Sequence, residues 1–155
     1  KQFNPDTFPQ PIVRPKFSHI GNEIDLVCIL DSGADFCTIS ISVGKSLGID
    51  FSKTAPYEFR KKWDNVDKNN MKLVNKLIDE TIEKKYAIPT NYGCACGRTT
   101  AAFYYPIMIE IGDFKKEIMA LWTPADVPSL LGRIGIFDSL KEITFKKGRK
   151  FLIKI

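Results

Sequence analysis

Alternation of apolar and polar residues predicts long strands in the second half of the chain. Over Thr99–Ile111 every second residue is apolar, which is the period of a strand with one buried face. Gly112-Asp113 then predicts a tight turn, and 114–122 a returning strand. The side of the first strand expected to face the core carries Phe103, Tyr105, Ile107, Ile109 and Ile111.

The remaining segments are also mostly typical of strands. We expect 11–17 and 24–30 to form a hairpin around Gly21-Asn22-Glu23, because prolines in the first segment suit an edge strand. Residues 1–10 are expected to be an N-terminal arm. Further predictions are a strand at 36–41, a helical turn at 42–47, extended chain over 49–60, a glycine-containing loop at 90–97, a short helix near 136–141, and a final hairpin of 143–145 with 151–155.

One segment has a helical period instead. Apolar residues recur every three or four positions from Met71 to Tyr86, and Pro89 follows the pattern. This predicts an amphipathic helix at about 67–87, inside a helical insertion at about 64–89. The apolar stripe favours packing on the sheet over a position beside a binding cleft.

Composition narrows the class of protein. The chain has 155 residues, 44% of them hydrophobic, which suits one domain over 11–155. No apolar run approaches the ~20 residues of a membrane-spanning helix, so we expect no membrane partner and a cytoplasmic location. The net charge is +5, yet the basic runs at 60–62 and 146–150 lack interleaved aromatic residues, which disfavours nucleic acid as a partner.

The cysteines do not suggest a metal site. Cys28 and Cys37 lie in apolar runs and are expected to be buried, while Cys94 and Cys96 have C-x-C spacing without a second pair. A structural zinc ion needs four suitably spaced ligands, and the single histidine, His19, is far away in sequence. Free thiols in a reducing compartment are the simpler interpretation.

The candidate chemistry lies at the end of a predicted strand. The apolar run 26–30 leads directly into Asp31-Ser32-Gly33-Ala34-Asp35. A carboxylate there is costly unless it is hydrogen-bonded, paired or used in function. Near the other end of the chain stands Leu130-Leu131-Gly132-Arg133.

These two motifs in this order, with β-rich sequence between them, resemble the retropepsin-like aspartic proteases. The resemblance covers about 11–155 and implies a mainly β, single-lobe, closed barrel-like fold. It implies an aspartic endopeptidase that acts on polypeptides with no cofactor and no metal. In such enzymes two carboxylates share one proton around a water molecule. The 67–87 helix lies outside the minimal family pattern.

The chain holds one Asp-Ser-Gly, since Asp138-Ser139-Leu140 lacks the glycine. The resemblance therefore implies a homodimer in which Asp31 of each subunit meets across a two-fold axis. Leu130 and Leu131 would pack beneath the loop that carries Asp31.

The resemblance also implies roles for the other residues of the loop. Ser32 would hydrogen-bond across the dimer axis. The carbonyl of Gly33 would accept a hydrogen bond from a substrate amide, and Ala34 would line a side-chain pocket. Asp35 would contact the substrate backbone and pair with Arg133, which braces the loop.

A flap that closes over the substrate is the last element implied. The best candidate is the stretch around Gly93-Cys94-Ala95-Cys96-Gly97, because glycine permits a mobile tip. Cysteines there would suggest redox sensitivity. An ordinary turn is the alternative for this segment.

Two other functions remain open. A retropepsin-fold module could bind peptides or dimerise without cutting, and a basic β-rich domain could bind nucleic acid. A module that had lost catalysis would be expected to lose the acid, the hydroxyl or the glycine of the motif. The chain keeps all three, which favours catalysis. The terminal strand 151–155 is expected to pair within the sheet or with a partner subunit.

Overall fold

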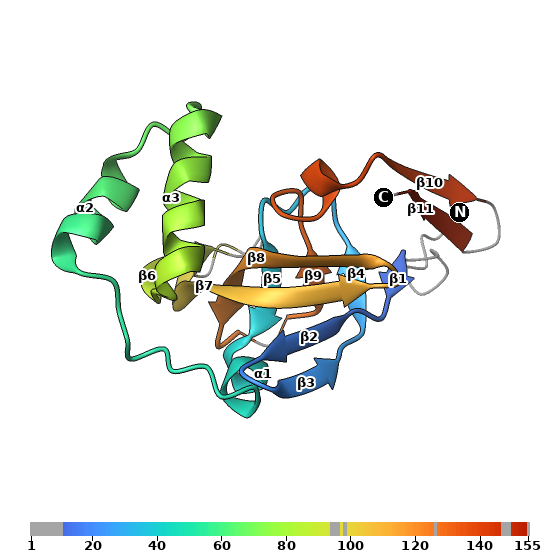
Figure 1. Ribbon diagram of the computed structural model, residues 1–155, viewed down its shortest axis with the longest axis horizontal. Coiled ribbons are helices and arrows are strands. Elements are labelled where there is room, and N and C mark those ends of the chain that lie inside the picture. Colours follow the sequence, from blue (N-terminus) through green and yellow to red (C-terminus); the bar gives the residue numbers. More distant parts are fainter. Residues whose placement is uncertain (1–10, 94–96, 98, 126, 147–149, 155) are drawn as a thin grey trace.

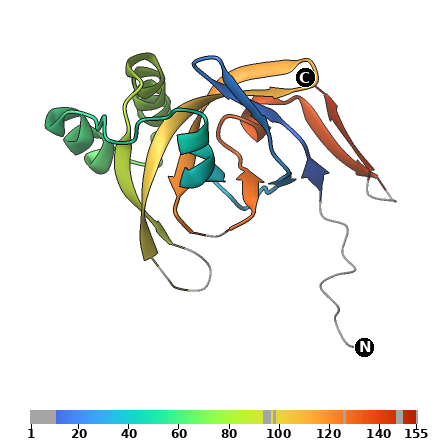
Figure 2. The ribbon, with the colours of Figure 1, turned by 90° about the horizontal axis from the view of Figure 1, so that it is seen from below.

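The computed structural model describes residues 11–93, 97, 99–125, 127–146 and 150–154. Within these ranges the fold is mainly β, as predicted, and nine strands form one curled sheet (Figures 1 and 2). The strands are β1 (Ile12–Val13), β2 (Lys16–His19), β3 (Asn22–Asp25), β4 (Cys28–Leu30), β5 (Cys37–Ser40), β6 (Ile88–Gly93), β7 (Thr99–Ile111), β8 (Phe114–Thr123) and β9 (Ser129–Leu131). The predicted arm at 1–10 lies outside the described residues.

The order of the strands brings distant parts of the chain together. The sheet runs β1-β4-β9-β5-β8-β7-β2-β3, with β6 paired to β7. The pairs β4–β9 and β5–β8 are parallel, and the other pairs are antiparallel. Strand β9 therefore lies between β4 and β5, although about a hundred residues separate β4 from β9 along the chain.

The N-terminal half differs from the prediction in its strand boundaries. The β2–β3 hairpin forms, but 24–30 is not one strand, because the chain leaves the sheet at Leu26 and Val27. The predicted hairpin of 11–17 with 24–30 still forms, because β1 pairs with β4 in the same register as β2 with β3. Strand β4 also pairs with β9. The turn lies at Ile20-Gly21, where both residues have positive φ.

In the second half of the chain, the strands match the alternation of apolar and polar residues closely. β7 and β8 form the predicted hairpin, paired from Phe103–Trp122 to Ile111–Phe114. The segment 90–97 is not entirely a loop, because its first residues belong to β6, an edge strand whose residue Pro89 pairs with Phe103. The final hairpin β10 (Glu142–Lys146) with β11 (Lys150–Lys154) forms a separate two-stranded sheet.

The short helices lie close to their predicted positions. α1 (Ile41–Ser46) begins after Ser40, whose hydroxyl accepts a hydrogen bond from the Ser42 N–H at 3.3 Å. Gly48 follows it with φ +80°. The 3₁₀ helix η2 (Phe137–Ser139) lies within the predicted 136–141.

The helical insertion begins before the predicted residue 64, since it lies between Thr54 and Ala87 and contains two helices. α3 (Met71–Lys84) matches the predicted stripe and buries Val74, Leu77 and Ile78. α2 (Tyr57–Asn65) corrects the extended chain predicted up to residue 60. In α2 only Phe59 and Trp63 are buried, so the stripe is too sparse to show a period in the sequence. No helix in the described ranges is long and apolar enough to cross a membrane.

Two hydrophobic cores result. The first core lies within the curled sheet, with Phe17, Ile39 and Trp122 fully buried. The second core joins α2 and α3 to the sheet through Ile88 and Met119. Helices α2 and α3 lie at the opposite end of the sheet from the β10–β11 hairpin (Figures 1 and 2).

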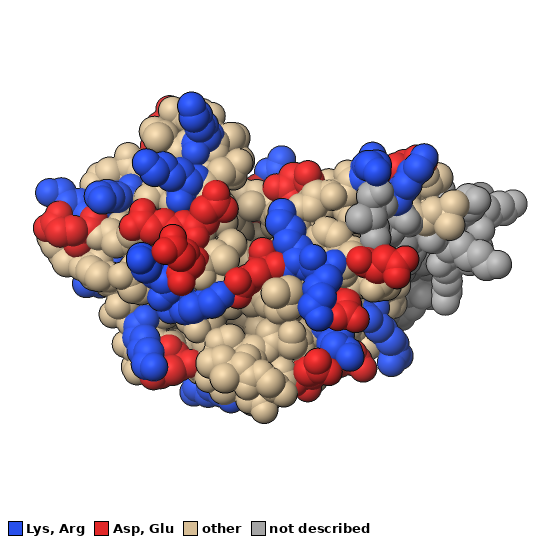
Figure 3. Space-filling model, viewed as in Figure 1, with Lys and Arg blue, Asp and Glu red and all other residues tan. Residues whose placement is uncertain are grey.

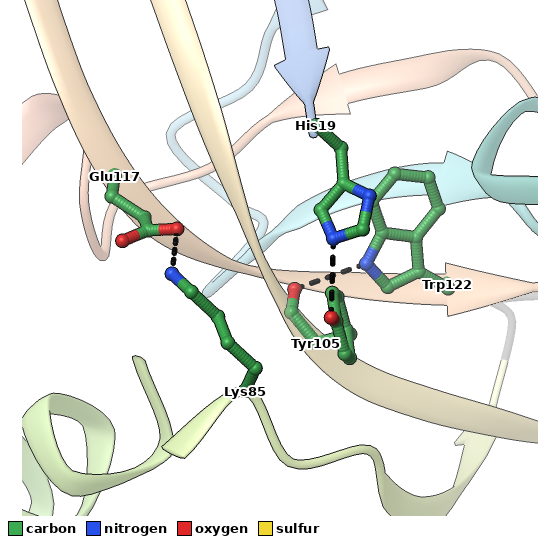
Figure 4. A network of polar contacts seen from close by, with 5 residues as sticks. All are labelled: His19, Lys85, Tyr105, Glu117 and Trp122. Carbon is green, nitrogen blue, oxygen red and sulfur yellow. Dashed lines mark hydrogen bonds and ion pairs between the residues drawn. The ribbon is translucent and has the colours of Figure 1, made fainter. Parts of the chain in front are cut away.

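Polar contacts link the insertion to the sheet and join β2, β7 and β8 within it (Figure 4). Lys85, directly after α3, forms an ion pair with Glu117 of β8. His19 Nε2 lies 3.2 Å from the Tyr105 hydroxyl, and Trp122 Nε1 donates to the Tyr105 carbonyl at 3.0 Å. Charges of both signs are mixed over the face shown in Figure 3.

Candidate active site

The Asp31 loop is an extension of the β4–β9 pairing. The Asp31 N–H donates to the Leu131 carbonyl at 3.0 Å, so the parallel register continues one residue past Leu30. The Ala34 N–H then donates to the Asp31 carbonyl at 3.2 Å and closes a turn. The acid is therefore held by main-chain hydrogen bonds at the end of a strand, as the sequence predicted.

The carboxylate of Asp31 is oriented by its own loop. The Gly33 N–H donates to Asp31 Oδ1 at 2.8 Å. A Cβ on Gly33 would lie 3.1 Å from the same oxygen, a contact too close for most side chains. Asp31 is half-buried, whereas Ser32 and Gly33 are exposed. The carboxylate is thus fixed in direction by the main chain and only partly covered.

The residues after β9 clamp the far end of this loop. The Arg133 N–H donates to the Ala34 carbonyl at 2.9 Å, and the Ile134 N–H donates to the Asp35 carbonyl at 2.7 Å. Gly132 permits this approach, because a Cβ there would lie 2.5 Å from the Phe36 carbonyl oxygen. Backbone packing therefore requires a glycine at position 132.

Arg133 and Asp35 also form an ion pair, the contact that the resemblance implies. Their side chains are 60% and 62% exposed, so the pair contributes little to stability. Its effect is on position, because it fixes both side chains beside the loop. Leu131 is fully buried and its carbonyl accepts the Asp31 N–H, while Leu130 is half-buried.

The short helix η2 is hydrogen-bonded to the main chain of Arg133 and Gly135. The Asp138 N–H donates to the Arg133 carbonyl at 3.1 Å, and Asp138 Oδ1 accepts from the Gly135 N–H at 2.8 Å. The Ser139 hydroxyl donates to the Gly135 carbonyl at 3.1 Å. Asp138-Ser139 therefore has a structural role, consistent with its failure to match the Asp-Ser-Gly motif.

The candidate flap lies at the end of the β6–β7 hairpin. Gly93 is the last residue of β6 and pairs with Thr99, and Gly97 has φ +78°. Cys94, Ala95 and Cys96 lie outside the described residues, so the flap role of this segment stays a prediction.

The titratable groups near the loop differ in their surroundings. Burial raises the pKa of both Cys28 and Cys37 to about 12, so both thiols are neutral. Burial, reinforced by the Asp35 carboxylate, also raises the pKa of Tyr104. No group of three or more His, Cys, Asp or Glu residues in the described ranges could hold a metal ion.

Phe36 and Tyr104 are neighbours of the loop that the sequence analysis missed. Their rings lie 4.9 Å apart, and both line the same cavity as Asp35. The alternation in β7 contained the signal for Tyr104. Since Phe103 and Tyr105 face one side, Tyr104 must face the other.

Comparisons with known proteins support the fold alone. No family model matches the chain, and no curated protein matches it by sequence. The chain is similar in structure to a retropepsin-like aspartic protease from Rickettsia conorii, with TM-score 0.51 and 18% identity over 97% of this chain and 92% of that one. A second similar structure is EIAV protease complexed with the inhibitor HBY-793, with TM-score 0.46 and 16% identity over 86% and 88% of the two chains. The fold is retropepsin-like.

Proposed function

We propose that this protein is a homodimeric aspartic endopeptidase. The observation that carries the proposal is the Asp31 carboxylate, which is oriented by the Gly33 N–H and half-exposed at the end of two parallel strands. A buried, fully paired acid would have only a structural role. Here the main chain fixes the acid, and one side of it stays accessible.

The chemistry needs a second carboxylate. Two carboxylates close together cannot both ionise easily, so the pair titrates jointly and holds one proton. The ionised member takes a proton from a water molecule, which attacks the scissile carbonyl carbon. The protonated member donates a hydrogen bond to the carbonyl oxygen. Because the sequence carries one Asp-Ser-Gly, the second acid is Asp31 of an identical subunit.

The other loop residues have supporting roles in this proposal. Exposed Ser32 bonds across the two-fold axis, and the Gly33 carbonyl and Asp35 hold the substrate backbone. Ala34 lines a side-chain pocket. Arg133 is a positioning residue, because it reaches the substrate only through Asp35. Gly93 to Gly97 form the flap.

The test compares wild-type protein with Asp31→Asn, using an unfolded protein as substrate from acidic to neutral pH. We expect the substitution to lower the rate of cleavage by about 10²–10⁴-fold, the usual contribution of an acid–base group. Asp113→Asn, in the exposed turn between β7 and β8, is the matched control and should cleave normally. Peptide products are identified by mass spectrometry.

Mixing the two proteins tests the shared site. If each site needs two Asp31 carboxylates, an equal mixture at fixed total concentration retains about one quarter of the wild-type activity. Independent subunits would retain about one half, which would overturn the dimer. Absence of cleavage in the wild type would overturn the protease and leave the non-catalytic peptide-binding module.

A further inference from the structure

A cavity of about 570 Å³ lies between the helical insertion and the candidate active-site loop. This volume is within the range of pockets that bind small ligands. Its walls are mostly apolar, with four charged residues among them, and come from both regions. The insertion contributes Trp63, Met71, Val74 and Leu77, and the sheet side contributes Phe36 and Tyr104.

The cavity adjoins the end of the Asp31 loop. Asp35 and Arg133, which clamp the end of the Asp31 loop, also line it. Phe36, the next residue along the chain, stacks near Tyr104, which in turn lies 5.3 Å from the Trp63 ring. A peptide bound along Asp35 would therefore pass the mouth of the cavity. Asp31 does not line the cavity, so its occupant is not next to the cleaved bond.

The charges around the cavity balance. Asp35 and Asp138 carry two negative charges, and Lys68 and Arg133 carry two positive ones. Arg133 is paired with Asp35, and Lys68 donates to the Trp63 carbonyl at 3.1 Å and lies 5.3 Å from the centroid of that ring. A charged ligand would find no net attraction here. An uncharged side chain attached to a peptide backbone fits both the apolar walls and the donors and acceptors of the rim.

We propose that this cavity is a specificity pocket for a large apolar side chain of an extended peptide. The proposal rests on the proposed function, since it assigns part of the same substrate to the insertion. The helices α2 and α3 then select which peptides bind, while the Asp31 loop cuts them.

The test uses two substitutions in the first turn of α3. Met71 lines the cavity and Leu73 does not, and each is 47% exposed. Met71→Trp places a bulky ring at the mouth, and the exposed position lets the helix accept it. Leu73→Trp is the matched control. Thermal melting of both variants checks that the fold is kept.

Two readouts separate this proposal from the proposed function. The first is kcat/KM for short peptides in which Phe, Leu, Ala or Lys is placed at each position in turn. The second is fluorescence anisotropy of the same peptides, labelled, with the non-cleaving Asp31→Asn protein. We expect one position to prefer Phe or Leu over Ala by at least about tenfold, the effect of a filled apolar pocket. Met71→Trp should abolish that preference, and Leu73→Trp should keep it.

The outcomes are distinct. If Met71→Trp cleaves peptides with the same side-chain preference as the wild type, the specificity pocket is overturned and the proposed protease activity stands. Peptide binding that Met71→Trp weakens, without any cleavage, supports the pocket and overturns the protease. If neither binding nor cleavage depends on an apolar residue at any position, the pocket is overturned.

Discussion

The two hydrophobic cores of this protein are built in different ways. In the first core, strands from both halves of the chain interlock, so that β9 pairs with both β4 and β5. The second core is a local addition, because the insertion leaves and rejoins the sheet at one place. There Thr54 bridges to Ala87, and the Ala55 N–H donates to the Ala87 carbonyl at 2.9 Å. The difference suggests that the first core fixes the Asp31 loop while the second can vary around it.

The largest loss of stability should come from a substitution in the first core, at Gly132. Gly132→Ala puts a Cβ 2.5 Å from the Phe36 carbonyl oxygen and 2.8 Å from that of Ala34. Because both contacts are with backbone, we expect a loss of about 4 kcal/mol or more in the free energy of unfolding, measured by urea denaturation. Gly93→Ala is the control, since a Cβ at that position would meet nothing within 4 Å. Equal stability of both variants would show that the β9 segment is not packed as described.

A smaller and more local effect should come from the second core. Trp63→Ala removes a buried ring that contacts Tyr104, at an expected cost of about 3 kcal/mol. Hydrogen exchange should rise in α2 and α3 and stay slow in β7 and β8. Tyr57→Ala, in the same helix but 66% exposed, should change little. Faster exchange throughout the sheet would show that the two cores unfold as one unit.

The smallest change in stability at neutral pH should come from two buried thiols of the first core. Their ionisation changes the free energy of unfolding only at alkaline pH. The pKa of Cys28 and of Cys37 rises from 9.0 to about 12 on burial. Below pH 9 both thiols are protonated in the folded and unfolded states, and their contribution to stability is complete. Between pH 9 and 12 the folded state holds more protons, so stability falls by about 1.4 kcal/mol per pH unit for each thiol.

Urea denaturation across this range measures the slope. The double variant Cys28→Ala with Cys37→Ala should lose the part of the slope that the thiols cause. An unchanged slope would assign the alkaline loss of stability to other groups.

The sequence predicted the elements whose signal is local. The alternation in Thr99–Ile111 and the stripe from Met71 gave β7 and α3, and the mainly β fold class is confirmed. The Asp35–Arg133 contact came from two motifs matched to a family, not from any local period.

Elements that depend on distant partners were missed. α2 has only Phe59 and Trp63 to bury, and they pack against residues contributed by α3 and the sheet. β6 contains proline and polar residues and is a strand because β7 pairs with it. The cavity beside Asp35 needs both α2 and α3, so the sequence alone could not reveal it.

The separation of Asp35 and Arg133 by 98 residues also has a consequence during synthesis. Loops closed over such a distance form late in folding. A nascent chain that has not yet released β9 from the ribosome has no partner for β4, and nothing clamps its Asp31 loop. The order of translation would thus leave the Asp31 loop without its main-chain hydrogen bonds until the residues after β9 have left the ribosome.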